Sequence, residues 1–241
     1  MTTFFISDLH LDASRPATLR AFLSFINGPA ERAEALYILG DLFEAWVGDD
    51  DDSPLATAVR DGLQQLSTRV PIYLMHGNRD FLIGDDFCMD TGCVLLHDPT
   101  LINIHGRHAL LMHGDTLCTA DTDYLAFRDQ VRQKNWQQAL LAKPLAERRD
   151  IAAQLREGSR KASSNKAEDI MDVTAAEVDR IMAEYGVDLL IHGHTHRPAT
   201  HAVKHGTRMV LGDWDALGWC IRWDRHGPEL ESFPISPLSS S

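Results

Sequence analysis

The chain has 241 residues, of which 44% are hydrophobic and 24% charged, a composition that supports one folded domain with a sizeable core. Its formal net charge of -12 at pH 7 argues against a broad nucleic-acid-binding surface, because phosphate contacts need clustered Lys and Arg. The four cysteines, Cys88, Cys93, Cys118 and Cys220, have neither CxxC spacing nor the density of a disulfide scaffold, so we expect reduced core residues.

The sequence contains no segment that predicts export or membrane insertion. The first ten residues, MTTFFISDLH, lack the basic start and the long apolar run of a signal peptide. No stretch approaches the roughly 18 uncharged apolar residues that would span a bilayer. We therefore expect a cytosolic protein.

Five short apolar runs predict buried strands, and polar residues of the types that bind metals follow each run. In chain order, FFIS leads to Asp8 and His10, ALYIL to Asp41, PIYLM to Asn78, HALLM to His113, and DLLI to His192 and His194. Because ligands bind at the carboxyl ends of strands in open α/β sheets, these distant residues are expected to converge in space.

Helices are predicted between the strands, over residues 16–25 and 54–66 and from about 123 to 185, where interruptions are expected near Pro144 and Gly158. The segment from Arg208 to Asp224 predicts two further strands that form a hairpin.

The acidic run from Asp49 to Asp52 is interpreted as a solvated loop rather than as a metal site. Adjacent like charges repel one another and prefer contact with water.

The joint order of five short motifs is more informative than any one of them. DLH, GDLFE, GNRD, HGD and HGHTH follow one another at residues 8–10, 40–44, 77–80, 113–115 and 192–196. This succession resembles the calcineurin-like metallophosphoesterase superfamily from residue 6 to about residue 198. The resemblance implies an α/β fold, a four-layer α-β-β-α sandwich. All 241 residues would form one metallophosphoesterase domain with a helical insert, or lid, at about 123–185.

The motifs supply nitrogen and oxygen donors without a thiolate, which suits borderline divalent ions such as manganese, iron or zinc. The resemblance assigns one ion to Asp8, His10, Asp41 and His196, and a second ion to Asp41, Asn78, His113 and His194. Asp41 would bridge the two ions, whereas His192 would support its neighbours or the fold. Two such ions hold a bridging hydroxide and clamp phosphoryl oxygens during in-line attack.

GNRD places Arg79 where the protein-phosphatase branch, which resembles GNHD, has a histidine. A guanidinium is a poor proton donor but a good bidentate clamp for phosphate oxygens. We therefore predict that Arg79 is catalytic together with Asp41; a surface salt bridge is the alternative for Arg79. Asp80 would orient Arg79 or a ligand imidazole.

Longer stretches carry a narrower resemblance. SDLHL, YILGDLFEAWVGDD, HGNRDFL, MHGDTLCT and LIHGHTHRPA are similar, nearly word for word, to the bacterial UDP-2,3-diacylglucosamine diphosphatase family. This resemblance implies a hydrolase with two Mn²⁺ ions per chain, acting in lipid A biosynthesis. A metal-activated hydroxide would attack the α-phosphorus of UDP-2,3-diacylglucosamine and release UMP and 2,3-diacylglucosamine 1-phosphate (lipid X). The substrate contacts carried over by position are Asn78, Arg79, Asp121, Ser159, Ser163, Lys166 and His194, with Asn165 as an alternative to Ser163.

The segment from 128 to 166 is locally basic, with ten basic residues against four acidic ones. Apolar residues alternate with the cations, at Trp136, Leu140, Leu141, Leu145, Ile151 and Leu155. This pattern predicts helices that lie on an anionic membrane surface or cover acyl chains; a solvated charged face over a packed core is the alternative. With the resemblance, it favours peripheral binding at the cytoplasmic face of the inner membrane, without nucleic acid or an obligate protein partner.

Two alternative functions stay open. One is a broader phosphodiesterase or nucleotide hydrolase on the same scaffold. The other is a metal-free scaffold that binds protein partners, which should have lost metal ligands, whereas all seven candidates are present.

Overall fold

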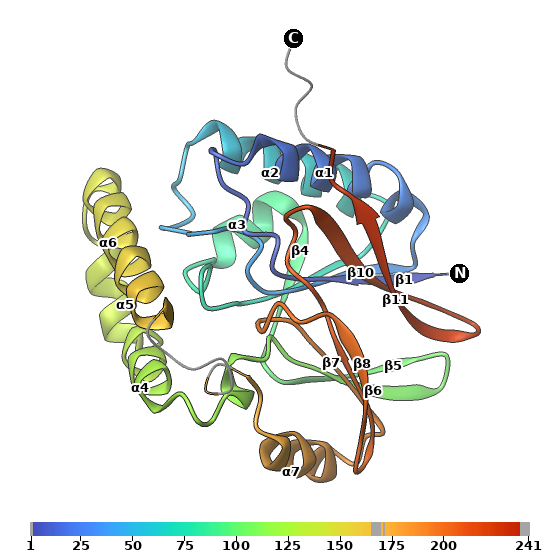
Figure 1. Cartoon of the computed structure of the whole chain (residues 1–241). Helices are drawn as coiled ribbons and strands as arrows, with labels where there is room; N and C mark the ends of the chain where they lie inside the picture. Colours follow the sequence, from blue (N-terminus) through green and yellow to red (C-terminus); the bar gives the residue numbers. More distant parts are fainter. Residues whose placement is uncertain (1, 165–169, 171, 237–241) are drawn as a thin grey trace.

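Two mixed β-sheets lie face to face, and helices cover the outer surface of each sheet (Figure 1). A computed structural model describes residues 2–164, 170 and 172–236. The layers follow one another as helix, sheet, sheet and helix, so the predicted four-layer α-β-β-α sandwich is confirmed.

The first sheet has six strands in the order β11-β10-β1-β2-β3-β4. Their bounds are Gly227–Pro234 for β11, Leu217–Asp224 for β10, Thr3–Ile6 for β1, Ala35–Leu39 for β2, Ile72–Met75 for β3 and Cys93–Leu96 for β4. Strands β1 to β4 are parallel, and β10 runs antiparallel to β1. The central strands read as nearly continuous apolar runs because helices cover one face of this sheet and the second sheet covers the other.

The second sheet has five strands in the order β5-β6-β7-β9-β8. Their bounds are Thr100–Ile104 for β5, Arg107–Leu111 for β6, Leu189–His192 for β7, Gly206–Val210 for β9 and Ala199–Val203 for β8. Strands β6, β7 and β9 are parallel to one another. The parallel strands of both sheets therefore supply the loops that carry the predicted ligands.

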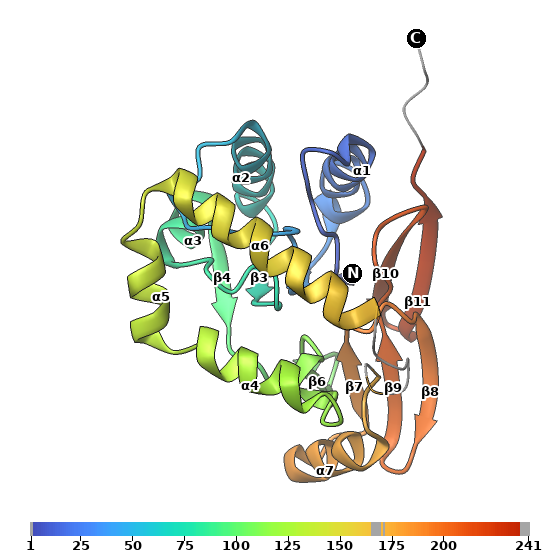
Figure 2. The same cartoon turned by 60° about the vertical axis from the view of Figure 1, so that its left-hand side comes forward.

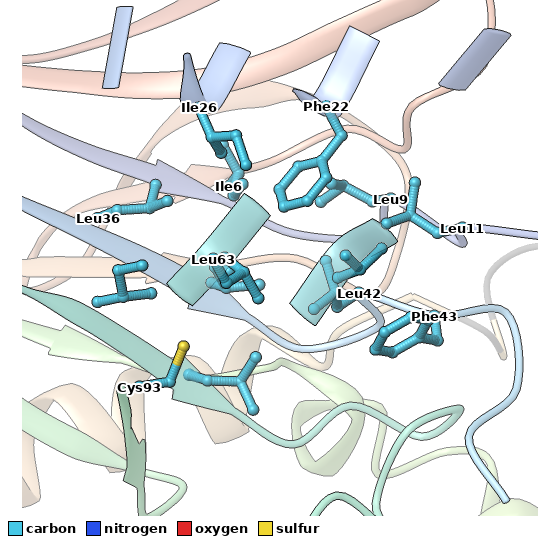
Figure 3. Close-up of a cluster of buried hydrophobic side chains, with 14 of the residues drawn as sticks. Ile6, Leu9, Leu11, Phe22, Ile26, Leu36, Leu42, Phe43, Leu63 and Cys93 are labelled. Atoms are coloured by element: carbon cyan, nitrogen blue, oxygen red, sulfur yellow. The ribbon is translucent and has the colours of Figure 1, made fainter. Parts of the chain in front are cut away.

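Helices α1 (Pro16–Ile26), α2 (Pro54–Ser67) and α3 (Asp85–Thr91) cover the first sheet. Figure 3 shows Phe22 and Ile26 of α1, Leu63 of α2 and the strand residues Ile6 and Leu36 in one buried cluster. Helix α2 begins where the Ser53 side chain accepts a hydrogen bond from the backbone N–H of Ala56 at 3.2 Å. This capped, amphipathic helix closes the largest core of the protein.

Three helices stand apart from the sheets at the left of Figure 1, and Figure 2 shows them from the front: α4 (Thr122–Val131), α5 (Lys134–Leu141) and α6 (Leu145–Ser164). The last helix of the predicted insert, α7 (Ala175–Tyr185), instead packs Val178, Ile181 and Met182 on the outer face of the second sheet. We use the name lid helices for α4, α5 and α6. The single-domain assignment of all 241 residues stays a prediction.

The expected hairpin from Arg208 to Asp224 is wrong. Arg208 lies in β9, which pairs with β7 and β8 of the second sheet. Strand β10 pairs with β1 and β11 of the first sheet instead. The chain thus crosses from one sheet to the other between the two strands, a choice that a local apolar pattern does not encode.

Helix α6 also runs without a break through Gly158, contrary to the predicted interruption. One glycine in a helix interior costs only about 1 kcal/mol, and the residues on either side of Gly158 continue the helix. The predicted break at Pro144 is confirmed, since this residue lies between α5 and α6.

The acidic run is an exposed loop, as its interpretation expects, with the Asp50 and Asp52 side chains 63% and 83% exposed, but the lid also forms ion pairs with it. The nearly buried Arg148 side chain of α6 forms an ion pair with Asp50 and donates to the Val47 carbonyl at 2.6 Å. Arg149 lies 2.6 Å from Asp51. The charges repel one another along the chain, but cations almost a hundred residues away neutralise them.

No helix in the described ranges is both long enough and apolar enough to cross a membrane.

We predict that Leu63→Ala lowers the free energy of unfolding by about 3 kcal/mol, because it leaves a cavity beneath α2 in a fully buried position. Gln65→Ala, at an exposed position of the same helix, should stay within about 0.5 kcal/mol of the unmodified protein. Urea unfolding followed by circular dichroism measures both, and equal effects would contradict the core assignment.

Candidate metal centre and active site

The turns that follow β1, β2 and β7 have an unusual backbone. Asp8, His10, Asp41, His194 and His196 all have positive φ angles, from 47° to 67°. Non-glycine residues adopt this left-handed region rarely, and such strain gathers at functional sites. Five of the seven predicted ligands thus leave their strands in sharp turns that aim their side chains toward one place.

Asp8, His10 and His196 form the first cluster of donors. The Nε2 atoms of His10 and His196 are 3.1 Å apart, and His196 Nε2 lies 3.4 Å from Asp8 Oδ1. That carboxylate oxygen is buried and has no hydrogen-bond partner. Buried polar atoms normally have a hydrogen-bond partner. A buried carboxylate oxygen that has none, and that faces imidazole nitrogens, is suited to bind a cation.

Asp41, His113, Asn78 and His194 form the second group of donors. Asn78 Oδ1 lies 3.0 Å from both His113 Nε2 and His194 Nδ1. Asp41 Oδ2 lies 3.9 Å from His113 Nε2 and 3.8 Å from His10 Nε2 of the first cluster. Asp41 therefore stands between the two groups, as the bridging role predicts.

Neighbouring groups orient these donors so that one atom of each is left for the site. The Ser7 hydroxyl and the His194 backbone N–H donate to Asp8 Oδ2 at 2.5 and 2.9 Å, which leaves Oδ1. The Arg79 backbone N–H donates to Asp41 Oδ1 at 2.8 Å, which leaves Oδ2. His113 Nδ1 lies 2.9 Å from the Leu39 carbonyl, which leaves Nε2. Such supporting contacts fix ligand geometry in metal sites.

Asp80 supports the site in a way that differs from its predicted role. Its buried carboxylate accepts backbone hydrogen bonds from Leu42 at 2.7 Å, Gly77 at 2.8 Å and Asp41 at 3.3 Å. The contacts that it makes go to the loops after β2 and β3, not to the Arg79 guanidinium or a ligand imidazole. Asp80 thereby joins the two loops that carry Asp41 and Asn78.

Two glycines allow these loops to approach closely. A Cβ on Gly77 would lie 2.0 Å from Asp41 Oδ1, and one on Gly193 would lie 2.2 Å from Asp8 Oδ2. Any side chain at either position would displace a candidate ligand.

His192 has the supporting role that the sequence predicts. It is fully buried, and its Nδ1 lies 2.8 Å from the Gly193 carbonyl. Burial lowers its pKa to about 3, so the imidazole is neutral at physiological pH. It holds the turn that carries His194 and His196.

Two cavities meet beside the donors. The first, of about 290 Å³, is lined by His10, Asp41, His194 and His196 among others. The second, of about 380 Å³, extends beneath the lid helices and is lined largely by apolar side chains, namely Trp46, Phe81, Leu82, Phe127, Trp136, Leu140, Ile151 and Leu155. Five residues line both cavities: Asn78, Arg79, Asp121, Tyr124 and Ser159. We call these the polar cavity and the apolar cavity.

The predicted substrate contacts divide into two groups. Asn78, Arg79, Asp121, Ser159 and His194 all line the polar cavity. The Ser163 side chain, Asn165 and Lys166 lie outside the described part of the structure. Arg79 is half-buried between the cavities, a place that fits a phosphate clamp better than the alternative surface salt bridge.

Sequence reasoning missed two residues of the site. Glu44 Oε2 lies 2.8 Å from His10 Nδ1, and the ring of Tyr124 lies 5.9 Å from that of His194. The motif GDLFE contains Glu44, whose spacing from Asp41 was the available signal. Nothing local to Tyr124 marks it, because its position depends on the packing of α4.

The electrostatics of the donors depend on the carboxylates around them. Burial by itself would lower the pKa of His113 and of His196. The charges of Asp41, Asp115 and Asp8 instead raise the pKa of His113 to about 9, and Asp8, whose Oδ1 lies 3.4 Å from His196 Nε2, raises the pKa of His196 to about 9. At neutral pH both imidazoles hold protons that a metal ion has to displace.

We predict that the affinity of the metal-free protein for Mn²⁺ rises from about pH 7 to about pH 9 and then levels off. The protonated imidazoles are no ligands, so binding releases protons until the pH exceeds the raised pKa values. Calorimetry in buffers of different ionisation enthalpy counts these protons. His196→Gln should release about one proton fewer; metal binding without proton release would contradict the prediction.

Comparisons with known proteins agree with this geometry. A family model described as calcineurin-like phosphoesterase matches residues 1–198. A UDP-2,3-diacylglucosamine hydrolase of Cellvibrio japonicus is 55% identical over 240 residues, covering 98% of this chain and 100% of the relative. One of Pseudomonas aeruginosa is 50% identical over 242 residues, with the same coverage.

A solved archaeal phosphodiesterase superposes with a TM-score of 0.51 at 12% identity, covering 98% of this chain and 100% of that one, a likeness of fold alone. The family model and the relatives lead to one assignment: the chain belongs to the calcineurin-like phosphoesterases and, within them, to the UDP-2,3-diacylglucosamine hydrolase family.

Proposed function

We propose that this chain hydrolyses the diphosphate of UDP-2,3-diacylglucosamine, giving UMP and 2,3-diacylglucosamine 1-phosphate in lipid A biosynthesis, with two Mn²⁺ ions. The observation that carries the proposal is the junction of the two cavities through five shared residues. A polar cavity with cation ligands suits a diphosphate, and an apolar cavity opening from it suits acyl chains. The relatives named above support the same substrate.

In this proposal Asp8, His10, Asp41 and His196 hold one ion, and Asp41, Asn78, His113 and His194 hold the other. Bound ions there supply Lewis acidity to the phosphoryl group and activate water for attack on the α-phosphorus. The mixture of imidazole, amide and carboxylate donors suits manganese. Asp41 is the residue on which both positions depend.

Arg79 acts beside the ions as a clamp. It lines both cavities, and its backbone N–H orients the Asp41 carboxylate. A guanidinium there binds phosphate oxygens in bidentate fashion and stabilises the charge that builds on the leaving phosphate. Asn78, Asp121, Ser159 and His194 complete the polar contacts, and we extend the proposal to Ser163 and Lys166.

In this proposal the acyl chains bind beneath the lid helices. Trp136 and Leu140 of α5 and Ile151 and Leu155 of α6 line the apolar cavity. These residues belong to the apolar face that the sequence predicts, so this face encloses a space rather than only packing on a core.

The lid helices could also let a lipid substrate enter the apolar cavity from a membrane. Each lid helix exposes one large apolar side chain, with Phe127, Leu141 and Leu155 between 37% and 40% exposed. We propose that these side chains touch the cytoplasmic face of the inner membrane while a lipid substrate enters, which makes the enzyme a peripheral membrane protein.

Asp41→Ala should reduce turnover more than about 100-fold, because both ions lose a ligand. Loss of a group that only supports a ligand costs at most about 100-fold. The measurement is release of UMP from UDP-2,3-diacylglucosamine by metal-stripped protein with and without Mn²⁺. Circular dichroism should be unchanged. Near-normal turnover would refute the two-ion assignment, and ¹⁸O-labelled water reports whether UMP carries the label.

Ala152→Trp should raise the KM for the diacylated substrate by on the order of 10-fold, because the indole fills space that the acyl chains need. Hydrolysis of bis-(p-nitrophenyl) phosphate should persist. Ala153→Trp, at the exposed neighbouring position, is the matched control. Equal effects on both substrates, or preference for the small ester in the unmodified protein, would favour a broader phosphodiesterase.

A further inference from the structure

Three arginines of the lid helices reach out of the lid and contact the loops that carry candidate metal ligands. Arg128 and Arg132 come from α4, and Arg156 comes from α6. Each arginine contacts a group that lies against a candidate ligand or within two residues of one in the sequence. No family role assigned above covers these contacts.

Arg156 acts on the first cluster through Glu44. Its guanidinium forms an ion pair with Glu44 Oε1, while Glu44 Oε2 lies 2.8 Å from His10 Nδ1. One carboxylate thus connects the lid to an imidazole whose other nitrogen faces the site. The pair is only partly exposed, with Arg156 at 29% and Glu44 at 19%.

Arg128 acts on the loop after β6. Its Nε donates to Asp115 Oδ2 at 2.7 Å, and the Tyr124 hydroxyl donates to the same oxygen at 2.5 Å. Asp115 is fully buried and lies two residues after His113. A buried carboxylate that lost the Arg128 donor would be left without its compensating cation, so Asp115 would shift and the His113 loop would move with it.

Arg132 acts on the loop after β3. Its guanidinium donates to the Gly77 carbonyl at 2.8 Å and lies 5.2 Å from the centre of the Phe81 ring. Gly77 directly precedes Asn78, and it is the glycine whose approach to Asp41 admits no side chain. The arginine therefore fixes the backbone from which Asn78 reaches both His113 and His194.

Other lid arginines provide a contrast. Arg149 on α6 lies 2.6 Å from Asp51 and 3.2 Å from Asp52. That acidic run carries no candidate ligand. The same helix therefore makes ion pairs of two kinds, one toward the metal loops and one away from them, and this difference allows a controlled test.

We propose that Arg128, Arg132 and Arg156 are positioning residues of the metal centre, which make the affinity of the two ions depend on the seating of the lid. Arg156 serves the ion held with His10, whereas Arg128 and Arg132 serve the ion held with Asn78 and His113. The inference rests on the two-ion site of the proposed function but not on the identity of the substrate.

The test is titration of metal-stripped protein with Mn²⁺ in the absence of substrate. Calorimetry gives the two affinities, and electron paramagnetic resonance separates a coupled ion pair from a single ion. Arg156→Gln should weaken one ion by on the order of 10-fold, and Arg128→Gln and Arg132→Gln should weaken the other by a similar factor, the range for losing a supporting contact. Arg149→Gln should leave both affinities unchanged.

Circular dichroism and thermal unfolding of the metal-free variants show whether each is folded. If Arg128→Gln does not fold, Arg128→Lys keeps the charge and should bind its ion more weakly than the unmodified protein but fold normally. Unchanged affinities in the folded variants, or a loss no larger than in Arg149→Gln, would overturn the proposal. Failure of the unmodified protein to hydrolyse the lipid substrate would instead refute the proposed function, because no substrate enters this titration.

Discussion

The structure depends on one electrostatic constraint: two buried carboxylates, those of Asp8 and Asp41, lie among four imidazoles at the edge where both sheets end. Burying carboxylates costs free energy unless positive charge compensates them. In the metal-free chain raised pKa values keep protons on His113 and His196. Divalent ions held by these residues would supply more positive charge beside Asp8 Oδ1, which has no hydrogen-bond partner in the described structure. The strained turns after β1, β2 and β7 persist because the surrounding hydrogen bonds fix them.

The sandwich makes this convergence possible. Strands β1, β2 and β3 of one sheet and β6 and β7 of the other end at the same edge, so their loops meet although they lie almost two hundred residues apart. The cores on both sides of the first sheet hold these strands rigidly. Rigid strands with short loops fix ligand positions more closely than long mobile segments do.

The lid is tied to this edge at several points rather than hinged at one. Arg148 and Arg149 bind the acidic run, and Arg156 binds Glu44. The lid thereby forms the roof of the apolar cavity and also contacts the metal loops. In the proposed function, a substrate that pushed the lid helices apart would disturb the same contacts, and lipid binding would then affect the positions of the metal ligands. The acidic composition of the chain does not oppose an anionic substrate, because local cations determine the field at the site.

The sequence alone predicted the candidate ligands, the strands that lead to them and the amphipathic pattern of the lid, because short motifs and the spacing of apolar residues indicate each of these features. It also predicted that His192 is a supporting residue, and it predicted the bounds of α2 to within one residue. Tertiary structure decided which sheet receives β9 and which receives β10, and that α7 packs on a sheet while α4 to α6 do not. It also decided the partners of Asp50, Glu44 and Asp115. These residues meet their partners through ion pairs and hydrogen bonds that form only in the folded chain. The sequence around a carboxylate does not indicate which distant cation will contact it.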